Sequence, residues 1–330
     1  MPENARRPRL TPAMADIRRA VRESLGDLSE GQLVLVALSG GADSLALAAA
    51  TAFEAPRAGL RAGAVIIDHG LQEGSDEVAQ RAAEQATGLG LDPVIVRRID
   101  VGEQGGPEAA ARQARYAAFM SVRKETGAAA ILLGHTLDDQ AETVLLGLAR
   151  GSGAESLWGM HTVIGPMRRP MLQIRRDQTH QSCVDQGIEP WNDPHNSDDR
   201  YTRVRIRQRV LPMLDEELGG GVALALTRTA DQLREDAEAL AHFAQEQIGD
   251  LVEHAEAGLS LEAEALRANP PALRQRIIRL AVQSEFHVSL TRQQTLEVSR
   301  LVTDWHGQGP LHLPGLQVRR EGKRIFFAAA

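Results

Sequence analysis

The sequence contains very little cysteine and few aromatic residues. Cys183 is the single cysteine among 330 residues, so the chain cannot form an internal disulfide. One thiol also excludes a cluster of cysteine ligands around a metal and a cysteine pair for redox or sulfur-transfer chemistry. Phenylalanine, tryptophan and tyrosine together make up 3% of the chain, which argues against a nucleic-acid interface built mainly from stacked bases.

The chain also lacks segments that would direct it to a membrane. No apolar run approaches the ~20 residues that a membrane-spanning helix needs. Residues 1–10 contain arginine but not the apolar core of a signal peptide. We therefore expect a cytoplasmic protein without a membrane partner. The net charge of -7 argues against indiscriminate nucleic-acid binding, so any such contact must come from a local basic patch.

Hydrophobic residues, by contrast, make up 43% of the chain, which is enough for a substantial packed core. The first two thirds alternate short apolar runs with helical patterns. This order predicts a doubly wound α/β fold, in which a parallel sheet carries helices on both faces and binds ligands beyond the carboxyl ends of its strands. The expected strands are Leu33–Leu38, Ala62–Asp68, Pro93–Ile99 and Ala129–Leu133. The expected helices are Ser44–Phe53, Asp76–Gly88, Pro107–Thr126 and Leu137–Arg150.

The pattern changes at three consecutive glycines, residues 219–221, which predict a hinge. A long helical stretch follows over Val222–Ile248, and the chain closes with short strands around a turn at 319–324. We therefore expect two domains: an α/β domain over residues 1–218, and a smaller, mainly helical domain over 219–330 that ends in short β-strands.

The first expected strand stops abruptly at the sequence SGGADS, residues 39–44. Its glycine pair permits backbone angles that other residues avoid, so the turn can present N–H groups to an anion where the next helix begins. The two serine hydroxyls can donate to phosphate oxygens, and Asp43 suits a divalent cation between carboxylate and phosphate. A tight turn capped by serine and aspartate is the alternative interpretation. The segment has no lysine, which disfavours kinase-like and GTPase-like chemistry.

A second segment, GHTLDDQAETVLL at 134–146, places carboxylates on an expected helix. Asp138 and Glu142 lie one turn apart beside an apolar stripe. Two like charges at this spacing cost roughly 0.2–0.5 kcal/mol in an isolated helix, a penalty that a cation would remove. In the alternative interpretation, Asp138 and Asp139 favour a helix N-terminus capped by Thr136. Glu142 is then a solvated surface charge.

Arginine concentrates in two segments of this acidic protein. In EAAARQARY, Glu108 precedes Arg112 by four residues, so Arg112 and Arg115 fit either a salt-bridged helix face or a phosphate contact through the planar guanidinium. In RYTRVRIRQR, residues 200–209, arginine takes five of ten positions. This second segment fits RNA phosphates or pyrophosphate, and alternatively a solvated face paired with nearby carboxylates.

The segment SGGADS resembles the SGGxDS loop of the PP-loop, or N-type, ATP pyrophosphatases, which cleave ATP between its α- and β-phosphates and adenylate a substrate. Further motifs make the chain similar to the tRNA(Ile)-lysidine synthetases. These motifs are IIDHGL (66–71), EAAARQARY (108–116), GHTLDDQAETVLL (134–146), RRPML (168–172) and WNDPHNSDDRYTRVRIRQRVLP (191–212). Thr136 departs from the family pattern, which often has a second histidine there.

The resemblance implies a ligase that forms a carbon–nitrogen bond. Enzymes of this family use ATP to adenylate the 2-oxo group of the wobble cytidine in the CAU anticodon of tRNA(Ile). The ε-amine of L-lysine then displaces AMP to give lysidine, and diphosphate is the other product. The resemblance thus implies ATP as substrate, Mg2+ as cofactor and a C-terminal domain that binds tRNA. It leaves open whether the chain forms a homodimer.

The resemblance also implies roles for individual residues. Asp43 and Asp138 are expected to hold Mg2+, and Asp138 and Glu142 to bind lysine. Asp138 is the better candidate for assisting deprotonation of the amine, whose free pKa is ~10.4. The expected catalytic residues are Asp43, Asp138 and Glu142. The expected ATP-binding residues are Ser39, Gly40, Gly41, Ala42, Asp43, Ser44, Ile67, Asp68, Gly134 and His135. The expected contacts to tRNA or phosphate are Arg112, Arg115, Arg203, Arg205 and Arg207.

Other functions fit parts of this pattern. Thiolating relatives generally need paired cysteines, which Cys183 alone cannot supply, and no segment resembles the glutaminase nucleophile of an amidating enzyme. A non-catalytic module that holds ATP or tRNA would share the glycine-rich loop and the basic segments. The carboxylates argue against such a module, because excess negative charge weakens passive ATP binding unless a metal takes part.

Overall fold

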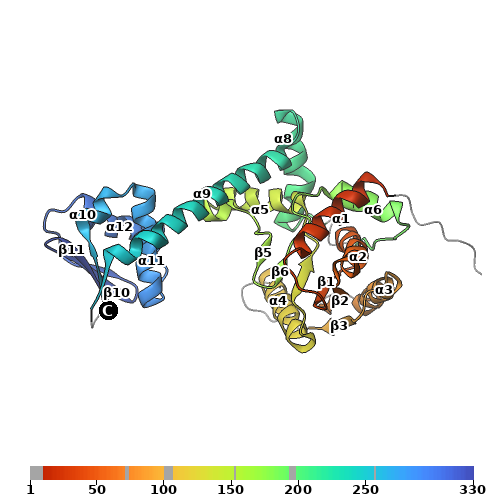
Figure 1. The fold of residues 1–330 in the computed structure, drawn as a ribbon. Helices are drawn as coiled ribbons and strands as arrows, with labels where there is room; N and C mark the ends of the chain where they lie inside the picture. The colour runs from red at the N-terminus through yellow and green to blue at the C-terminus, as the bar shows by residue number, and fades with distance from the viewer. Residues whose placement is uncertain (1–9, 71–73, 100–106, 152–153, 193–197, 256–257) are drawn as a thin grey trace, which may run out of the picture. The chain divides into compact units, whose positions relative to one another are not determined.

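The computed structural model describes residues 10–70, 74–99, 107–151, 154–192, 198–255 and 258–330 (Figure 1). It divides into two compact units, Met1–Ala230 and Asp231–Ala330, which we treat separately. The division falls inside helix α9 (Val222–Leu251), because the first residues of this helix pack on the first unit. The domain boundary expected at the three glycines stays a prediction. None of the described helices is long and apolar enough to cross a membrane.

The first unit is built on a six-stranded sheet of order β3-β2-β1-β4-β6-β5. All neighbouring strands run parallel except β5, which is antiparallel to β6. The predicted parallel α/β sheet is therefore confirmed. Its strands are β1 (Leu33–Ala37), β2 (Arg61–Asp68), β3 (Val94–Arg98), β4 (Ala130–Leu133), β5 (Val163–Ile164) and β6 (Met167–Arg168).

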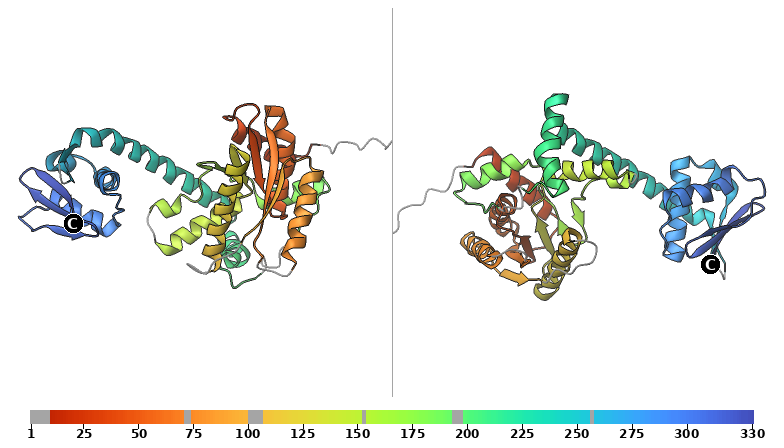
Figure 2. Two further views of the ribbon diagram at one scale, coloured as in Figure 1. Left: turned by 90° about the horizontal axis from the view of Figure 1, so that it is seen from below. Right: turned by 180° about the vertical axis from the view of Figure 1, so that it is seen from behind.

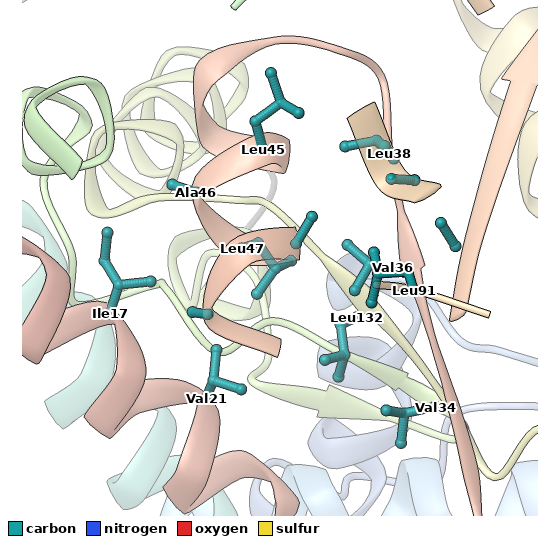
Figure 3. Close-up of a cluster of buried hydrophobic side chains, with 14 of the residues drawn as sticks. Ile17, Val21, Val34, Val36, Leu38, Leu45, Ala46, Leu47, Leu91 and Leu132 are labelled. Atoms are coloured by element: carbon teal, nitrogen blue, oxygen red, sulfur yellow. The ribbon is translucent and has the colours of Figure 1, made fainter. Parts of the chain in front are cut away.

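Helices cover both faces of this sheet, as the views in Figure 2 show. On one face, Val34 and Val36 of β1 pack with Ile17 and Leu47, which belong to α1 and α2 (Figure 3). Helices α3 and α6 add to this layer, whereas α4 packs on the opposite face. Burial on both faces explains why β1 is continuously apolar. The helices of the unit before α9 are α1 (Pro12–Leu25), α2 (Ala42–Glu54), α3 (Ser75–Gly88), α4 (Pro107–Thr126), α5 (Leu137–Arg150), α6 (Arg176–Asp185), α7 (Thr202–Arg205) and α8 (Leu211–Leu218).

The second unit packs helices against one face of an antiparallel sheet of order β7-β8-β11-β10-β9. The predicted turn at 319–324 connects β10 to β11. The fully buried residues of the second unit include Leu261, Ile277 and Val298. The elements are β7 (Val252–Ala255), β8 (Gly258–Glu262), α10 (Ala263–Ala268), α11 (Pro271–Phe286), α12 (Arg292–Thr303), β9 (Leu311–Leu313), β10 (Leu316–Glu321) and β11 (Arg324–Ala329).

Candidate active site

The SGGADS segment forms a tight turn between β1 and α2. Gly40 has a φ of +82°, which favours glycine, and its carbonyl accepts a hydrogen bond from the Trp191 N–H at 2.9 Å. Ser44 Oγ accepts from the Ser39 N–H at 3.1 Å and donates to the Gly41 carbonyl at 2.9 Å. Gly41 is the N-cap of α2 and gives it no side-chain cap. The positive end of α2 is therefore left for an anion.

The first turn of α2 is held in place from two sides. A Cβ on Gly134 would lie 3.1 Å from Ser44 N and 3.2 Å from the Asp43 carbonyl carbon, so only glycine lets β4 end this close to α2. On the other side, Cys183 Sγ donates to the Ala42 carbonyl at 3.4 Å. Burial, together with the charge of Asp43, raises the pKa of Cys183 to about 11, which makes this thiol a packing contact and not a nucleophile.

Asp68 and Ile67, at the end of β2, have structural partners. Asp68 Oδ1 accepts from the Gly70 N–H at 2.9 Å, a side-chain to backbone bond typical of a turn. Burial alone would raise the pKa of Asp68, but hydrogen bonds from Gly70 and Ser75 and the charge of Arg98 outweigh it and lower the pKa. Ile67 packs half-buried against the core. Their role in ATP binding stays a prediction.

Four carboxylates meet three guanidinium groups beside the first turn of α2. We call this set the acid–arginine network: Asp43, Asp138, Asp139 and Glu142, with Arg175, Arg176 and Arg207. The side chain of Glu142 is 0% exposed, so it is not the solvated charge of the alternative interpretation. Arg207 binds it with two nitrogens, at 2.7 Å from Oε1 and 3.2 Å from Oε2.

Arg176 connects the α2 and α5 parts of the network. Its Nη2 lies 2.7 Å from Asp139 Oδ1, and its Nη1 lies 3.4 Å from Glu142 Oε1. Its Nε lies 3.7 Å from Asp43 Oδ2. Its backbone N–H donates to Asp138 Oδ2 at 2.8 Å, so this carboxylate sits at the N-terminus of α6. Arg175 and Arg176 are not among the predicted site residues; in the sequence they stand out only as a basic pair that follows the RRPML motif.

Asp139 plays the capping part that the alternative interpretation gave it. Its Oδ2 accepts from the Thr136 N–H at 2.8 Å and from the Thr136 hydroxyl at 2.9 Å. Burial alone would raise the pKa of Asp139, but Arg176 and Thr136 outweigh it and lower the pKa. For Asp43, burial prevails over the Thr179 hydrogen bond and raises the pKa. The network thus moves two nearby carboxyl pKa values in opposite directions, a pattern common at acid–base sites.

We call a second group of side chains the arginine cluster: Arg112, Arg115 and Arg169 around Tyr116, with Arg203 near enough for its charge to act on Arg115. Arg112 and Arg169 each donate to the Tyr116 hydroxyl, both at 3.4 Å. Burial lowers the pKa of Arg115, and the charges of Arg112 and Arg203 lower it further. The Glu108 side chain, a possible partner of Arg112 in the sequence, lies outside the described residues.

His135 lies between the two groups. Burial lowers the pKa of His135 to about 4; Asp139 opposes this shift, and the charges of Arg169, Arg115 and Arg112 add to it. Its Nδ1 is buried and has no hydrogen-bond partner among the described residues. The imidazole is therefore neutral at pH 7 and can still offer a hydrogen bond to a ligand.

The structure separates the three arginines that were expected to contact RNA or phosphate in the second basic segment. Arg203 joins the arginine cluster and Arg207 joins the network. Arg205 donates to the carbonyls of Asp199 and Arg200, both at 2.8 Å, and so holds the turn before α7. The sequence spacing predicts this separation of Arg205 from the other two. Arg203 and Arg207 are four residues apart and share a helix face, whereas Arg205, midway between them, points away.

Comparisons with known proteins agree with this architecture. Residues 13–214 match the family model of the PP-loop domain, and residues 261–326 match the TilS substrate binding domain. The chain is 61% identical over 301 residues to the tRNA(Ile)-lysidine synthase of Leifsonia xyli subsp. xyli, covering 91% of each chain. It is 51% identical over 318 residues to the enzyme of that name from Thermobifida fusca, covering 95% of each.

A solved structure has a similar fold. The U34-tRNA thiolase NcsA from Methanococcus maripaludis, described with its [4Fe-4S] cluster, aligns with a TM-score of 0.57 at 17% identity. The alignment covers 68% of this chain and 80% of that one. At this identity the likeness concerns the fold alone.

Proposed function

The chain belongs to the tRNA(Ile)-lysidine synthase family, and from this membership we propose that it is a cytoplasmic ligase that joins L-lysine to the wobble cytidine in the CAU anticodon of tRNA(Ile). ATP adenylates the 2-oxo group of the cytidine and releases diphosphate. The ε-amine of lysine then attacks C2 and displaces AMP. The observation that carries the proposal is that Asp43 belongs both to the anion-binding turn and to the acid–arginine network.

Adenylation requires the triphosphate to be held while its α-phosphorus is attacked. The turn and the uncapped N-terminus of α2 supply backbone N–H groups and the positive helix end for this purpose. Among the described residues, no three His, Cys, Asp or Glu side chains form a metal-binding group. Asp43 still fits Mg2+, because that ion commonly takes one or two carboxylates plus phosphate oxygens. When bound, the ion would neutralise charge on the diphosphate leaving group.

Amine transfer requires a carboxylate pair that can hold an ammonium and accept its proton. Asp138 and Glu142 are better placed for this than Asp139, whose two oxygens serve Thr136 and Arg176. Asp138 and Glu142 already bind guanidinium groups, so their surroundings suit a cationic ligand. A lysine ammonium would compete with those guanidinium groups for the same oxygens. Lysine binding on the α5 side of the network therefore requires the ammonium to displace at least one of these guanidinium groups.

A direct reconstitution tests the proposal. The purified protein is incubated with ATP, Mg2+, labelled lysine and an unmodified CAU-anticodon tRNA(Ile) transcript. We expect label in the RNA, with AMP and diphosphate formed in equal amounts. A transcript with uridine at the wobble position is the matched control and should take up no label. Diphosphate release without RNA, or a complete mixture that yields no labelled RNA, would contradict the proposal.

A thiolating function has less support in the same fold. Cys183 is buried and its pKa is raised to about 11 by burial, so it cannot serve as a sulfur carrier. The reconstitution separates the two chemistries, because a thiolated cytidine would contain sulfur and no lysine.

A further inference from the structure

Thr179, on α6, has a buried hydroxyl that reaches a partner on another helix. The residue is 0% exposed. Its Oγ1 contacts the Arg176 carbonyl at 2.7 Å, one turn earlier in α6, and also Asp43 Oδ1, 136 residues away in the sequence. The first contact is the one that a threonine in a helix ordinarily makes. The second is not needed to satisfy the hydroxyl, which suggests that it serves Asp43.

The hydroxyl can donate fully to only one of these two acceptors, because it carries one proton. A hydrogen bond to an ionised carboxylate is roughly twice as strong as one to a neutral oxygen. We therefore expect the proton to lie on the side of Asp43 whenever that carboxylate is charged. The hydroxyl then fixes Oδ1, one of the two oxygens that Asp43 can offer to a cation.

The second oxygen of Asp43 is left for a ligand. Oδ2 lies 3.7 Å from Arg176 Nε, beyond hydrogen-bond distance, and accepts no hydrogen bond from the residues that the structure describes. The side chain is 26% exposed and belongs to the first turn of α2, at the anion-binding turn. The protein thus holds Asp43 through one oxygen, while the other has no competing hydrogen-bond donor.

Helix α6 is anchored independently of Asp43, so the hydroxyl positions the carboxylate and not the reverse. The helix packs on α1 and α2 (Figure 1). Near its start, Gln178 Nε2 donates to Asp16 Oδ2 at 3.0 Å. At its end, Asp185 Oδ2 accepts from the Thr11 hydroxyl at 2.5 Å. These two contacts fasten α6 to α1 on either side of the threonine.

We propose that Thr179 is a positioning residue for the metal ion that accompanies ATP, and that its hydroxyl holds Asp43 with Oδ2 free to bind Mg2+. The inference rests on the proposed function, which makes Asp43 a ligand of that ion. A carboxylate that binds a metal is commonly held by a hydrogen bond of its own, and loss of that bond weakens metal binding roughly 10–100-fold. Thr179 would therefore act on adenylation through Asp43, without touching ATP.

Binding of labelled ATP to the full-length protein, with and without Mg2+, tests the inference in the absence of RNA, lysine and turnover. The measured quantity is the factor by which Mg2+ tightens ATP binding in equilibrium dialysis. Thr179→Ala and Thr179→Ser both lack the methyl group, and only the serine variant keeps the hydroxyl. We expect this factor to fall about tenfold in Thr179→Ala and to stay near the wild-type value in Thr179→Ser. ATP binding without a divalent cation should be the same in all three proteins.

Thr51→Ala is the matched control. Thr51 is also 0% exposed and lies on α2, the helix that carries Asp43. Its hydroxyl donates to the Leu47 carbonyl at 2.8 Å, within its own helix. The substitution removes a buried hydroxyl of the same kind but should leave the effect of Mg2+ on ATP binding unchanged.

Several outcomes would overturn the inference. One is an equal effect of Mg2+ in Thr179→Ala and Thr179→Ser, and another is a loss in Thr51→Ala as large as in Thr179→Ala. Weaker ATP binding without Mg2+ in Thr179→Ala would mean that the hydroxyl acts on the turn and not on the metal. If Thr179→Ala lowers the melting temperature, Thr179→Val, which keeps the volume, replaces it in the comparison with Thr179→Ser.

The same measurement separates this inference from the proposed function. A hydroxyl-dependent effect of Mg2+ in a protein that makes no lysidine would support the inference while contradicting the proposed function. Lysidine formation together with an equal effect of Mg2+ in all the variants would leave the proposed function intact and refute the role of Thr179. If Mg2+ does not tighten ATP binding to the wild-type protein, the inference fails together with the metal role of Asp43.

Discussion

The acid–arginine network and the arginine cluster use the same cationic residue in opposite ways. In the network every guanidinium group contacts a carboxylate, and Glu142 is fully buried by these contacts. In the cluster, Arg112 and Arg169 contact a hydroxyl and Arg169 also a backbone carbonyl, and no carboxylate among the described residues pairs with any of the four guanidinium groups. Carboxylates that are paired with cations, as in the network, can exchange one cation for another. Guanidinium groups without a paired carboxylate, as in the cluster, are stabilised when an anion binds. Local charge balance therefore indicates the sign of the ligand better than the number of arginines does.

The largest expected effect comes from the residue shared by the anion-binding turn and the network. Asp43→Asn removes the charge that lies beside Arg176 and at the turn where we propose that the triphosphate binds. We expect RNA-dependent diphosphate release to fall on the order of 10³-fold, because one preorganised electrostatic group at a reacting phosphate is commonly worth that much. The measurement is single-turnover release of diphosphate from ATP. Full activity in this variant would separate the turn from the network and refute their common role.

The next largest effect is on the free energy of unfolding, and it distinguishes the acid–arginine network from the arginine cluster. Glu142→Gln leaves Arg207 without its bidentate partner and Arg176 with one contact fewer. We expect the free energy of unfolding of the first unit to fall by about 3 kcal/mol, as when one partner of a buried ion pair is removed. Urea unfolding measures this change. Arg203→Gln is the matched variant in the cluster and should leave the free energy of unfolding the same or higher, because it relieves repulsion between guanidinium groups. An equal loss of stability in both variants would contradict the difference that we infer between the network and the cluster.

Salt should act on the two regions unequally. If four guanidinium groups contact RNA phosphates, RNA affinity should fall about 100-fold between 50 and 200 mM salt. Lysine binding at the buried network should change much less, since salt screens buried charges weakly. Fluorescence anisotropy of labelled RNA and equilibrium dialysis of labelled lysine give the two slopes. Equal slopes would mean that the two sites do not differ in the way we infer.

The smallest expected effect concerns His135, which lies between the two regions. Its pKa is lowered by burial to about 4 from an ordinary 6.5, so the unfolded chain binds the proton more readily than the folded one. The stabilising effect is therefore complete above pH 6.5 and is lost as the pH falls towards 4; at pH 5 it should be reduced by about 2 kcal/mol. Chemical unfolding of wild type and His135→Gln at pH 7 and pH 5 measures the difference. His242→Gln, an exposed control, should follow the wild type, and parallel curves for wild type and His135→Gln would contradict the prediction.

The sequence was most informative where the physical signal is local. The apolar runs became β1, β2 and β4 because strands buried on both faces need no polar alternation, and the remaining run became the edge strand β3. Asp138 and Glu142 lie one turn apart on α5, as their spacing in the sequence predicts. Helix α1 was missed although Thr11 caps it and Pro12 follows, which are ordinary start signals. These cases depend on a few neighbouring residues.

The sequence was least informative where the partner is distant. Arg176 lies 34 residues from Glu142 and Arg207 lies 65, and no periodicity connects them. The cation that the carboxylates needed turned out to be supplied by the chain itself. Arg169 belongs to the RRPML motif, but its burial without a carboxylate partner among the described residues is a property of the assembled core. Such contacts depend on tertiary packing, which spacing along the chain does not encode.

Helix α6 touches both the first turn of α2 and the start of α5, through Cys183, Thr179 and Arg176. Because Cys183 is the single cysteine of the chain, the native protein carries its own kinetic probe of that junction. A thiol reagent can reach the sulfur only when α6 lifts away from Ala42, so the rate of labelling counts those openings. A ligand that contacts both α2 and α5 should lower the rate at which the reagent modifies Cys183. Comparing this rate with each substrate alone and in combination would show the order in which the substrates bind, without an engineered label.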